Sequence, residues 1–202
     1  MSECIDDLID AFLCLPSVGP RSAQRMAYHL LLGKRKKGLN LADCLTRAMT
    51  KVQHCQSCNT FSSESMCDLC SSKVRNKAQL CIVEMPLDRL AIEKTGAFSG
   101  QYFVLMGHLS PIDGIGPEQL AIDKLFARCK DVAFDEVIFA LNPSMEGEAT
   151  IHYLKEVLKP LNICFSQLAR GVPMGGELEF LDSSTIGRAL SKRSLMSEDD
   201  IL

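Results

Sequence analysis

Cys55-Gln-Ser-Cys58 and Cys67-Asp-Leu-Cys70 are two CxxC pairs with eight residues between them, and they separate a helical pattern from a pattern of alternating strands and helices. Each pair places two thiolates on one tight turn, and the short spacer lets the turns meet around one tetrahedral zinc ion. Four sulfur ligands leave no position for water or substrate. The spacing therefore predicts one structural zinc site formed by Cys55, Cys58, Cys67 and Cys70.

Two disulfides are the competing interpretation of these cysteines. The first residues contain no apolar leader-like run, and no stretch of the chain is apolar enough to span a membrane. We therefore expect a reducing, cytoplasmic compartment, where thiols persist and zinc is favoured. The six remaining cysteines belong to no motif, and we expect most of them to pack as small apolar side chains.

Length and composition are typical of a globular protein, with 202 residues, 47% hydrophobic, and a net charge of -3. The charge is uneven, because residues 1–78 contain 11 Lys and Arg against 7 Asp and Glu, whereas the rest contains 11 against 18. A basic first part suits nucleic acid, and an acidic remainder suits a basic partner protein. Chance combined with a need for solubility explains the asymmetry equally well.

The segment before the cysteines predicts three helices. Apolar residues recur at helical spacing over 8–13, residues 15–20 (Leu-Pro-Ser-Val-Gly-Pro) interrupt the pattern, and it resumes over 22–32. Asn40 is a suitable cap for a third helix, and residues 33–38 (Gly-Lys-Arg-Lys-Lys-Gly) predict a basic loop before it. The first two helices form a helix-hairpin-helix.

The start of the second helix is a candidate phosphate site. Unpaired N–H groups at a helix start attract anions, and Gly19 supplies either a close backbone approach or an unusual dihedral angle. Arg21 and Arg25 lie one turn apart on the same face. Lys34 and Arg35 in the basic loop would add a second contact. The alternative is an ordinary αα-hairpin whose basic side chains are only solvated.

After the cysteines, short apolar runs alternate with helical patterns, which predicts a parallel sheet covered on both faces. The expected strands are 80–83, 102–106, 137–141 and 163–165, and the expected helices are 86–95, 117–129 and 147–158.

Carboxylates follow two of these strands, where ligands bind in open parallel sheets. Glu84 follows the first run, Asp88 lies one turn further, and Glu146 and Glu148 follow the third run. Such groups hold Mg²⁺, which would support metal-assisted phosphoryl transfer, or they contact a partner. Exposed loop glutamates without a ligand are the alternative. No Walker-A loop, dinucleotide fingerprint or serine–histidine arrangement indicates another enzyme class.

Six segments of the chain are distinctive in combination. They are 15–30 (LPSVGPRSAQRMAYHL), the CxxC pairs, 83–86 (VEMP), 107–117 (GHLSPIDGIGP), 142–150 (NPSMEGEAT) and 171–176 (GVPMGG). Together they resemble the RecR family of bacterial recombination mediators, and the resemblance extends from the first helix to about residue 182.

This resemblance implies a helix-hairpin-helix domain over 1–53, a four-cysteine zinc motif over 54–78, a Toprim domain over 79–175 and a C-terminal segment over 176–202. It also implies a ring-like homotetramer that surrounds DNA without sequence preference. With RecO and RecF, the assembly would load recombinase on gapped DNA in the nucleoid. The family is regarded as non-enzymatic.

Site residues follow from the same resemblance by position. Arg21 and Arg25 take the places of basic residues that face DNA, and Glu84, Glu146 and Glu148 take those of the Toprim acidic cluster, used here for partner contact. Catalytic Toprim enzymes have Asp-x-Asp where this chain, like the family, has Glu146-Gly-Glu148. The longer side chains disfavour a tight Mg²⁺ geometry.

Two further points remain open from the sequence. A magnesium-dependent Toprim nuclease or strand-transfer enzyme is the alternative function, and a scaffold that never touches DNA is a third.

Ser17 stands in the hairpin where glycine is common in the family, and we expect it to stiffen the turn without abolishing it.

Overall fold

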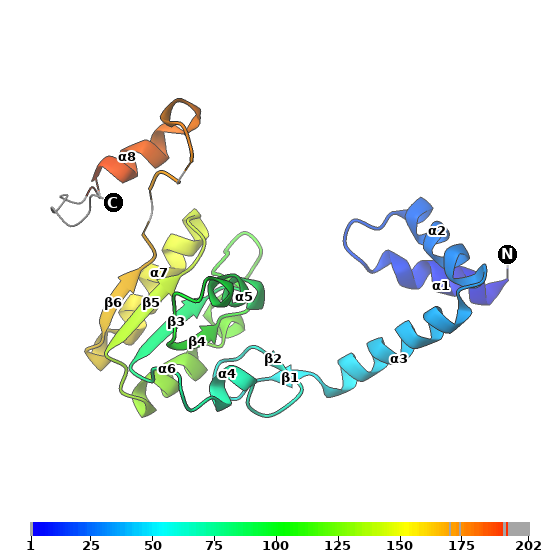
Figure 1. Ribbon diagram of the computed structural model, residues 1–202, viewed down its shortest axis with the longest axis horizontal. Coiled ribbons are helices and arrows are strands. Elements are labelled where there is room, and N and C mark those ends of the chain that lie inside the picture. Colours follow the sequence, from blue (N-terminus) through cyan, green and yellow to red (C-terminus); the bar gives the residue numbers. More distant parts are fainter. Residues whose placement is uncertain (1, 170, 174, 192, 194–202) are drawn as a thin grey trace. The chain divides into compact units, whose positions relative to one another are not determined.

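The structure is a computed structural model that describes residues 2–169, 171–173, 175–191 and 193 (Figure 1). Its backbone divides into two units, one made of Met1–Gln53 with Phe61–Ser65 and the other of His54–Thr60 with Met66–Leu202. Within the described residues, no helix is long and apolar enough to cross a membrane.

Three helices, α1 (Glu3–Leu13), α2 (Pro20–Leu31) and α3 (Arg35–Lys51), build the first unit. Its small core forms where Ile9 of α1 packs near Ala23 and Ala27 of α2, which are fully buried. The two alanines lie one turn apart, so they let α1 approach α2 closely. The predicted helix-hairpin-helix is therefore confirmed.

The hairpin between α1 and α2 is a tight turn over residues 15–18. The Val18 N–H donates to the Leu15 carbonyl at 3.2 Å, so Pro16 and Ser17 are the central residues. Ser17 has a φ of 65°, the left-handed conformation that the third residue of a type II turn requires. Glycine adopts this conformation freely, whereas serine is strained there.

Helix α3 begins at Arg35, so the prediction of a loop over 33–38 and a helix start at Asn40 was wrong. Only Leu32, Gly33, which has a φ of 86°, and Lys34 lie between α2 and α3. Lysine and arginine are good helix formers, and an added Cβ at Gly38 would meet the Leu30 side chain at an ordinary 3.7 Å. The basic residues therefore extend the helix.

The second unit contains a four-stranded parallel sheet in the order β4-β3-β5-β6. Its strands are β3 (Gln79–Val83), β4 (Gln101–Val104), β5 (Glu136–Ala140) and β6 (Cys164–Gln167). Because these strands are short apolar runs separated by helices, each connection crosses one face of the sheet. The predicted α/β class with a parallel sheet is confirmed.

Helices cover both faces of the sheet (Figure 1). Apolar residues of α6 (Ile122–Asp131) and α7 (Met145–Leu158) pack on one face against Leu80, Phe103 and Phe139. On the other face, Ile92 of α5 (Pro86–Thr95) and Leu69 of α4 (Asp68–Ser71) pack near Val83 and Tyr102. This two-sided burial explains why the strands are continuous apolar runs.

Two predicted helices differ in their boundaries. The stretch 117–129 is divided into a 3-10 turn, η1 (Pro117–Leu120), and α6, because Ala121 has a φ of 51°. Helix α7 starts two residues before the predicted Gly147, since the Ser144 hydroxyl accepts from the Gly147 N–H at 3.0 Å and caps it. The remaining elements are β1 (Gln53–His54), β2 (Phe61–Ser62), η2 (Lys159–Leu161), η3 (Leu178–Phe180) and α8 (Ser183–Ser191).

Candidate functional site

The four motif cysteines converge in the second unit. Their sulfur atoms all lie within 4.8 Å of one another, and those of Cys58 and Cys67 are 3.5 Å apart. Around a tetrahedral zinc ion, sulfurs about 2.3 Å from the metal lie about 3.8 Å from one another, so the cluster fits such an ion. Cys55, Cys58 and Cys67 are buried and Cys70 is half-buried. The group can therefore hold a metal such as zinc.

The backbone of the first turn prepares this arrangement. Asn59 adopts a left-handed φ of 62°, which turns the chain back so that the Cys55 N–H donates to the Thr60 carbonyl at 2.7 Å. The Cys67 N–H donates to the Cys55 sulfur at 3.3 Å. Hydrogen bonds from the Cys58 and Cys70 thiols hold the pKa of Cys67 well below its usual range. These bonds favour the thiolate that a metal binds.

Basic side chains surround the cysteine cluster. The Arg89 guanidinium, from α5, reaches the Cys67 sulfur at 3.8 Å, and the Lys124 ammonium, from α6, donates to the Cys55 carbonyl at 2.8 Å. Burial lowers the pKa of Arg128, whereas the nearby cysteine side chains act in the opposite direction. Four thiolates around a Zn²⁺ ion would carry a net negative charge, which these cations would offset.

The cysteine loop is bonded to the edge strand of the sheet. The Val104 N–H donates to the Cys58 carbonyl, and the Asn59 side-chain amide donates to the Val104 carbonyl, both at 2.9 Å. Arg128 donates to the Tyr102 carbonyl at 2.6 Å. Backbone groups of β4 that would otherwise lack partners are thereby satisfied. The metal site is consequently part of the sheet-containing unit.

The other cysteines follow the prediction only in part. Cys81 and Cys129 are buried, and burial raises the pKa of Cys129 to about 11, so this thiol stays protonated near neutral pH. Cys4, Cys14, Cys44 and Cys164 are exposed, so the expectation that most of the six pack in an apolar interior was wrong. Three of them lie on or beside the helices of the small first unit, which has little interior to offer.

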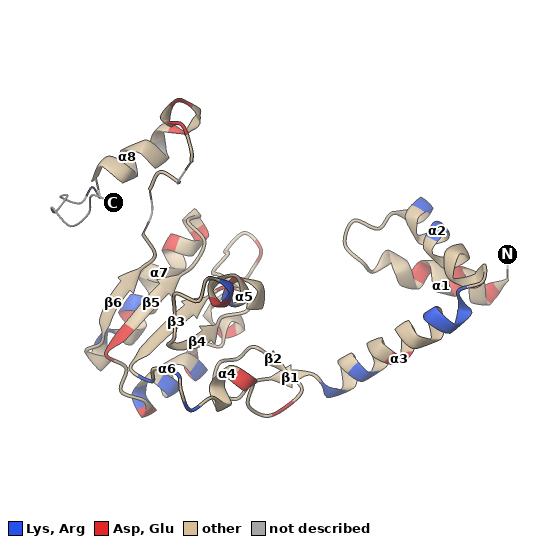
Figure 2. Ribbon diagram, in the orientation of Figure 1, with Lys and Arg blue, Asp and Glu red and all other residues tan. Residues whose placement is uncertain are grey.

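The predicted basic residues lie on the surface of the first unit, where Figure 2 shows Lys and Arg on α2 and α3. Arg21 and Arg25 are exposed on α2, and neither forms an ion pair with any part of the chain that the structure describes. Lys34 and Arg35 are exposed at the start of α3. The chain thus places two exposed arginines in the first two turns of α2 and two exposed basic residues at the start of α3.

Gly19 precedes α2 with a φ of -91° and a ψ of 173°, an ordinary extended conformation. Of the two roles predicted for Gly19, the unusual dihedral angle is therefore excluded. An added Cβ would meet nothing within 4 Å, and no side chain caps the helix. The absence of a side chain therefore leaves the N–H groups of the first turn accessible, as a bound anion requires.

The predicted carboxylates lie at the carboxyl end of the sheet but play different parts. Glu84 is only 2% exposed, and its carboxylate accepts from the Asn142 backbone N–H and side-chain amide, both at 2.8 Å. His108 Nδ1 lies 3.3 Å from the same carboxylate. Glu146 and Glu148 are half-exposed in the first turn of α7. Asp88 instead caps α5, where it accepts from the Met85 N–H at 2.8 Å.

Gly147 allows α7 to approach this edge. An added Cβ would lie 2.1 Å from the Asn142 carbonyl oxygen and 3.3 Å from Glu84 Oε1. Among the described residues, the four cysteines are the one group of three or more His, Cys, Asp or Glu side chains whose ligand atoms converge. Within the same residues, the carboxylates of Glu84, Glu146 and Glu148 do not form such a group.

Three residues of these sites were not predicted from the sequence, namely Asn142, His108 and Arg89. Asn142 directly follows the third apolar run, so its position at the carboxyl end of a strand was a usable signal. His108 and Arg89 carry no local signal, because their partners Glu84 and Cys67 lie more than twenty residues away in sequence.

Comparison with known proteins covers most of the chain. Models of the RecR helix-hairpin-helix, the Toprim domain and the RecR C-terminal region match residues 5–49, 78–169 and 171–194. The chain is similar to the recombination protein RecR of Legionella pneumophila subsp. pneumophila strain Philadelphia 1. The two are 47% identical over 195 residues, which cover 96% of this chain and 98% of that protein. From the cysteine cluster, the fold and these matches, we conclude that the chain belongs to the RecR family of recombination proteins.

Proposed function

We propose that this protein is a non-enzymatic DNA-binding clamp and adaptor in recombinational repair. The observation that carries the proposal is the surface of α2, where Arg21 and Arg25 are exposed, form no ion pair with any described residue, and follow the open helix start at Gly19. A phosphate there would accept from backbone N–H groups and from guanidinium groups together. Such contacts hold the backbone of DNA and carry no sequence information.

Lys34 and Arg35 extend the same DNA-binding role. Both are exposed at the start of α3, which directly follows α2 in the chain. Each additional phosphate contact releases a counterion, so affinity falls steeply as salt rises. The protein would act in the cytoplasm on nucleoid DNA, in particular on gapped duplexes.

One zinc ion per chain would be structural in this proposal. Cys55, Cys58, Cys67 and Cys70 fill a four-coordinate sphere, so the metal has no open position for substrate. Its effect would be to hold the cysteine loop against β4 through the Cys58 and Asn59 bonds to Val104.

The acidic edge of the sheet would receive RecO and RecF, which together with this protein load recombinase. Glu146 and Glu148 are accessible enough for direct contact. Glu84 would act indirectly, because it is buried and holds Asn142 and the start of α7 in place. The proposed partner contact does not depend on Mg²⁺, and the Glu84 carboxylate accepts hydrogen bonds from Asn142 instead.

Assembly into a homotetrameric ring is the last part of the proposal. Helix α3 has no buried residue in this single chain, although Leu41, Leu45 and Met49 form an apolar stripe along it and are 42%, 53% and 78% exposed. An amphipathic helix of this length gains most of its stability by packing that stripe. A second copy would supply the missing partner.

A labelled gapped duplex, incubated with and without Mg²⁺ and analysed on native and denaturing gels, tests DNA binding and cutting together. We expect shifted, intact DNA. Arg21→Ala with Arg25→Ala should weaken binding to all sequences alike and reduce the salt slope by about 2, because two phosphate contacts are lost.

Arg47→Ala is the matched control for this experiment, because Arg47 is an exposed arginine that already pairs with Asp43 at 3.2 Å. Unchanged affinity of the double variant would contradict the α2 site. Shortened or rejoined strands that disappear in Glu84→Gln would instead identify a magnesium-dependent Toprim enzyme.

A further inference from the structure

Large apolar side chains are exposed on the sheet domain mainly at one edge. Among residues 79–167, all of which the structure describes, six large apolar side chains are exposed. They are Met85, Leu87 and Leu90 of α5 and the turn before it, Ile112 of the loop after β4, Met145 at the start of α7, and Tyr153. Only Tyr153 does not follow the carboxyl end of a strand.

Direct contacts hold these segments together at that edge. Residues on all three segments converge on Glu84, because the Gly107 N–H donates to the Glu84 carbonyl at 3.1 Å and Asn142 donates to its carboxylate. The Leu109 N–H donates to the Thr150 hydroxyl of α7 at 2.9 Å. The first turns of α5 and α7 and the loop after β4 therefore form one surface, which we call the apolar edge.

The loop that carries Ile112 is fixed rather than free. Ser110 and Ile115 bond to each other in both directions, at 3.0 and 2.9 Å, and the Ser110 hydroxyl donates to Asp113 at 2.6 Å. Ile112 lies at the tip of this closed loop and is 93% exposed. Leu87 and Met145 are 74% and 87% exposed in the first turns of their helices. Ordered apolar side chains presented in this way mark an interaction site.

Carboxylates dominate the charge of the same three segments. Residues 84–90, 105–120 and 141–150 contain six Asp and Glu against one Arg and no Lys. That arginine, Arg89, is directed to the Cys67 sulfur. A phosphate backbone would be repelled here, whereas a segment with Lys or Arg beside apolar residues would be complementary.

We propose that the apolar edge binds a segment of another protein that presents a ridge of apolar side chains flanked by Lys and Arg. Leu87, Ile112 and Met145 are the anchors, and Glu146 and Asp113 select the charge of the partner. This inference rests on the proposed adaptor function, in which the same end of the sheet receives a partner. It adds that apolar contacts, more than carboxylates, hold the partner once bound.

Purified RecO and RecF, each fluorescently labelled, are the probes. Their affinity is measured for the full-length protein and for Leu87→Ser, Ile112→Ser and Met145→Ser. Because these side chains are already exposed, the variants should keep the fold and the DNA affinity of the parent protein. We expect each to weaken binding of at least one probe by about tenfold or more, mainly through faster dissociation.

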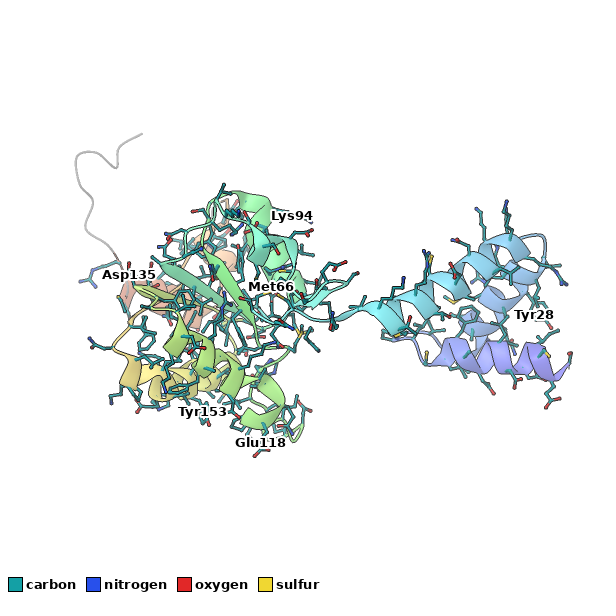
Figure 3. All side chains as sticks on the ribbon, turned by 90° about the horizontal axis from the view of Figure 1, so that it is seen from below. Tyr28, Met66, Lys94, Glu118, Asp135 and Tyr153 are labelled. Carbon is teal, nitrogen blue, oxygen red and sulfur yellow. The ribbon has the colours of Figure 1, made fainter. Side chains whose placement is uncertain are left out.

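Tyr153→Ser is the matched control, since Tyr153 is the exposed large apolar residue of this domain that lies further along α7, away from its start (Figure 3). Its affinity should equal that of the parent protein. Glu146→Lys should slow association and reduce its salt dependence.

Three outcomes would overturn the inference in distinguishable ways. Parent-like affinity of all three serine variants would refute the apolar anchors while leaving the adaptor function intact. A parent protein that binds neither probe would refute the partner part of the proposed function together with the inference. If the serine variants instead change the oligomeric state in light scattering, the occupant is a second copy of this chain, and the proposed heterologous partner is wrong.

Discussion

Ser17 shows how one residue in the hairpin affects stability. Its φ of 65° costs a residue with a Cβ roughly 1–2 kcal/mol. Glycine avoids this cost, but it loses more conformational entropy on folding, which reduces the gain in stability by roughly 0.5–1 kcal/mol. We expect Ser17→Gly to raise the free energy of unfolding by about 1 kcal/mol, measured by urea denaturation.

Ser63→Gly is the control for that substitution, because Ser63 is an exposed serine of the same unit outside the left-handed residues. It should not stabilise the protein. Equal stability of Ser17→Gly and the parent would contradict the strained turn.

Gly147 is the residue on which the approach of α7 to the sheet depends. Alanine at this position would place a Cβ 2.1 Å from the Asn142 carbonyl, so the backbone must move and the Asn142 bonds to Glu84 must weaken. We expect Gly147→Ala to lower the free energy of unfolding by about 1–3 kcal/mol. Thermal unfolding measured by circular dichroism checks the change.

Gly187→Ala is the control, because it replaces a helix glycine by alanine without creating a steric clash. Gly187 also lies in a helix, α8, but an added Cβ there meets nothing within 4 Å. Alanine should be neutral or slightly stabilising at Gly187, because alanine is the better helix former. Similar behaviour of both variants would mean that Gly147 is not under steric constraint.

At the scale of elements, the cysteine loop and strand β4 form one cooperative feature. The Val104 N–H donates outward to Cys58, whereas the next N–H along the chain, that of Leu105, donates inward to Val83 at 3.0 Å. Without a zinc ion to join the four cysteines, the loop would be less constrained, so its bond to Val104 should open more often.

Hydrogen exchange of the metal-free protein, prepared with a zinc chelator, tests this coupling. We expect the Val104 amide to exchange about tenfold faster or more, while the Leu105 amide keeps its protection. The helices of the first unit should be unaffected. Unchanged protection of Val104 would show that the loop is stable without metal.

Helix α3 has no buried residue in the single chain. Its apolar stripe is exposed, so we expect concentration-dependent association through it. Leu45→Asp should shift the protein to smaller species in light scattering, because a buried carboxylate is costly at an interface.

Asn40→Asp is the control for this variant, since it adds the same charge to an exposed position of α3 away from the stripe. It should leave the assembly unchanged. Identical behaviour of the two variants would contradict assembly through the α3 stripe.

For the whole molecule, the uneven charge has a structural counterpart. The first unit carries exposed basic side chains on α2 and α3 (Figure 2). The edge of the sheet that follows β3, β4 and β5 is instead acidic and apolar. DNA and a basic protein would therefore engage different units, and loss of one contact should not require loss of the other. The proposed DNA and partner assays measure the two independently.

The sequence alone determined the elements and motifs that depend on local order. CxxC spacing, helical periodicity and apolar runs predicted the cysteine cluster, the helix-hairpin-helix and the parallel sheet, because each follows from residues close together in the chain. Even there, the start of α3 was misplaced, since glycines at 33 and 38 suggested a loop, whereas the arginine and lysines between them are good helix formers and belong to the helix.

Tertiary structure alone decided which side chains meet. Arg89 reaches Cys67, Asn142 satisfies Glu84, and Val104 bonds to Cys58, although each pair is far apart in sequence. No local pattern encodes these contacts, because they arise only when strands and helices pack and leave buried polar groups in need of partners. For the same reason, Glu84 proved to be a buried anchor while Leu87, Ile112 and Met145 remained exposed.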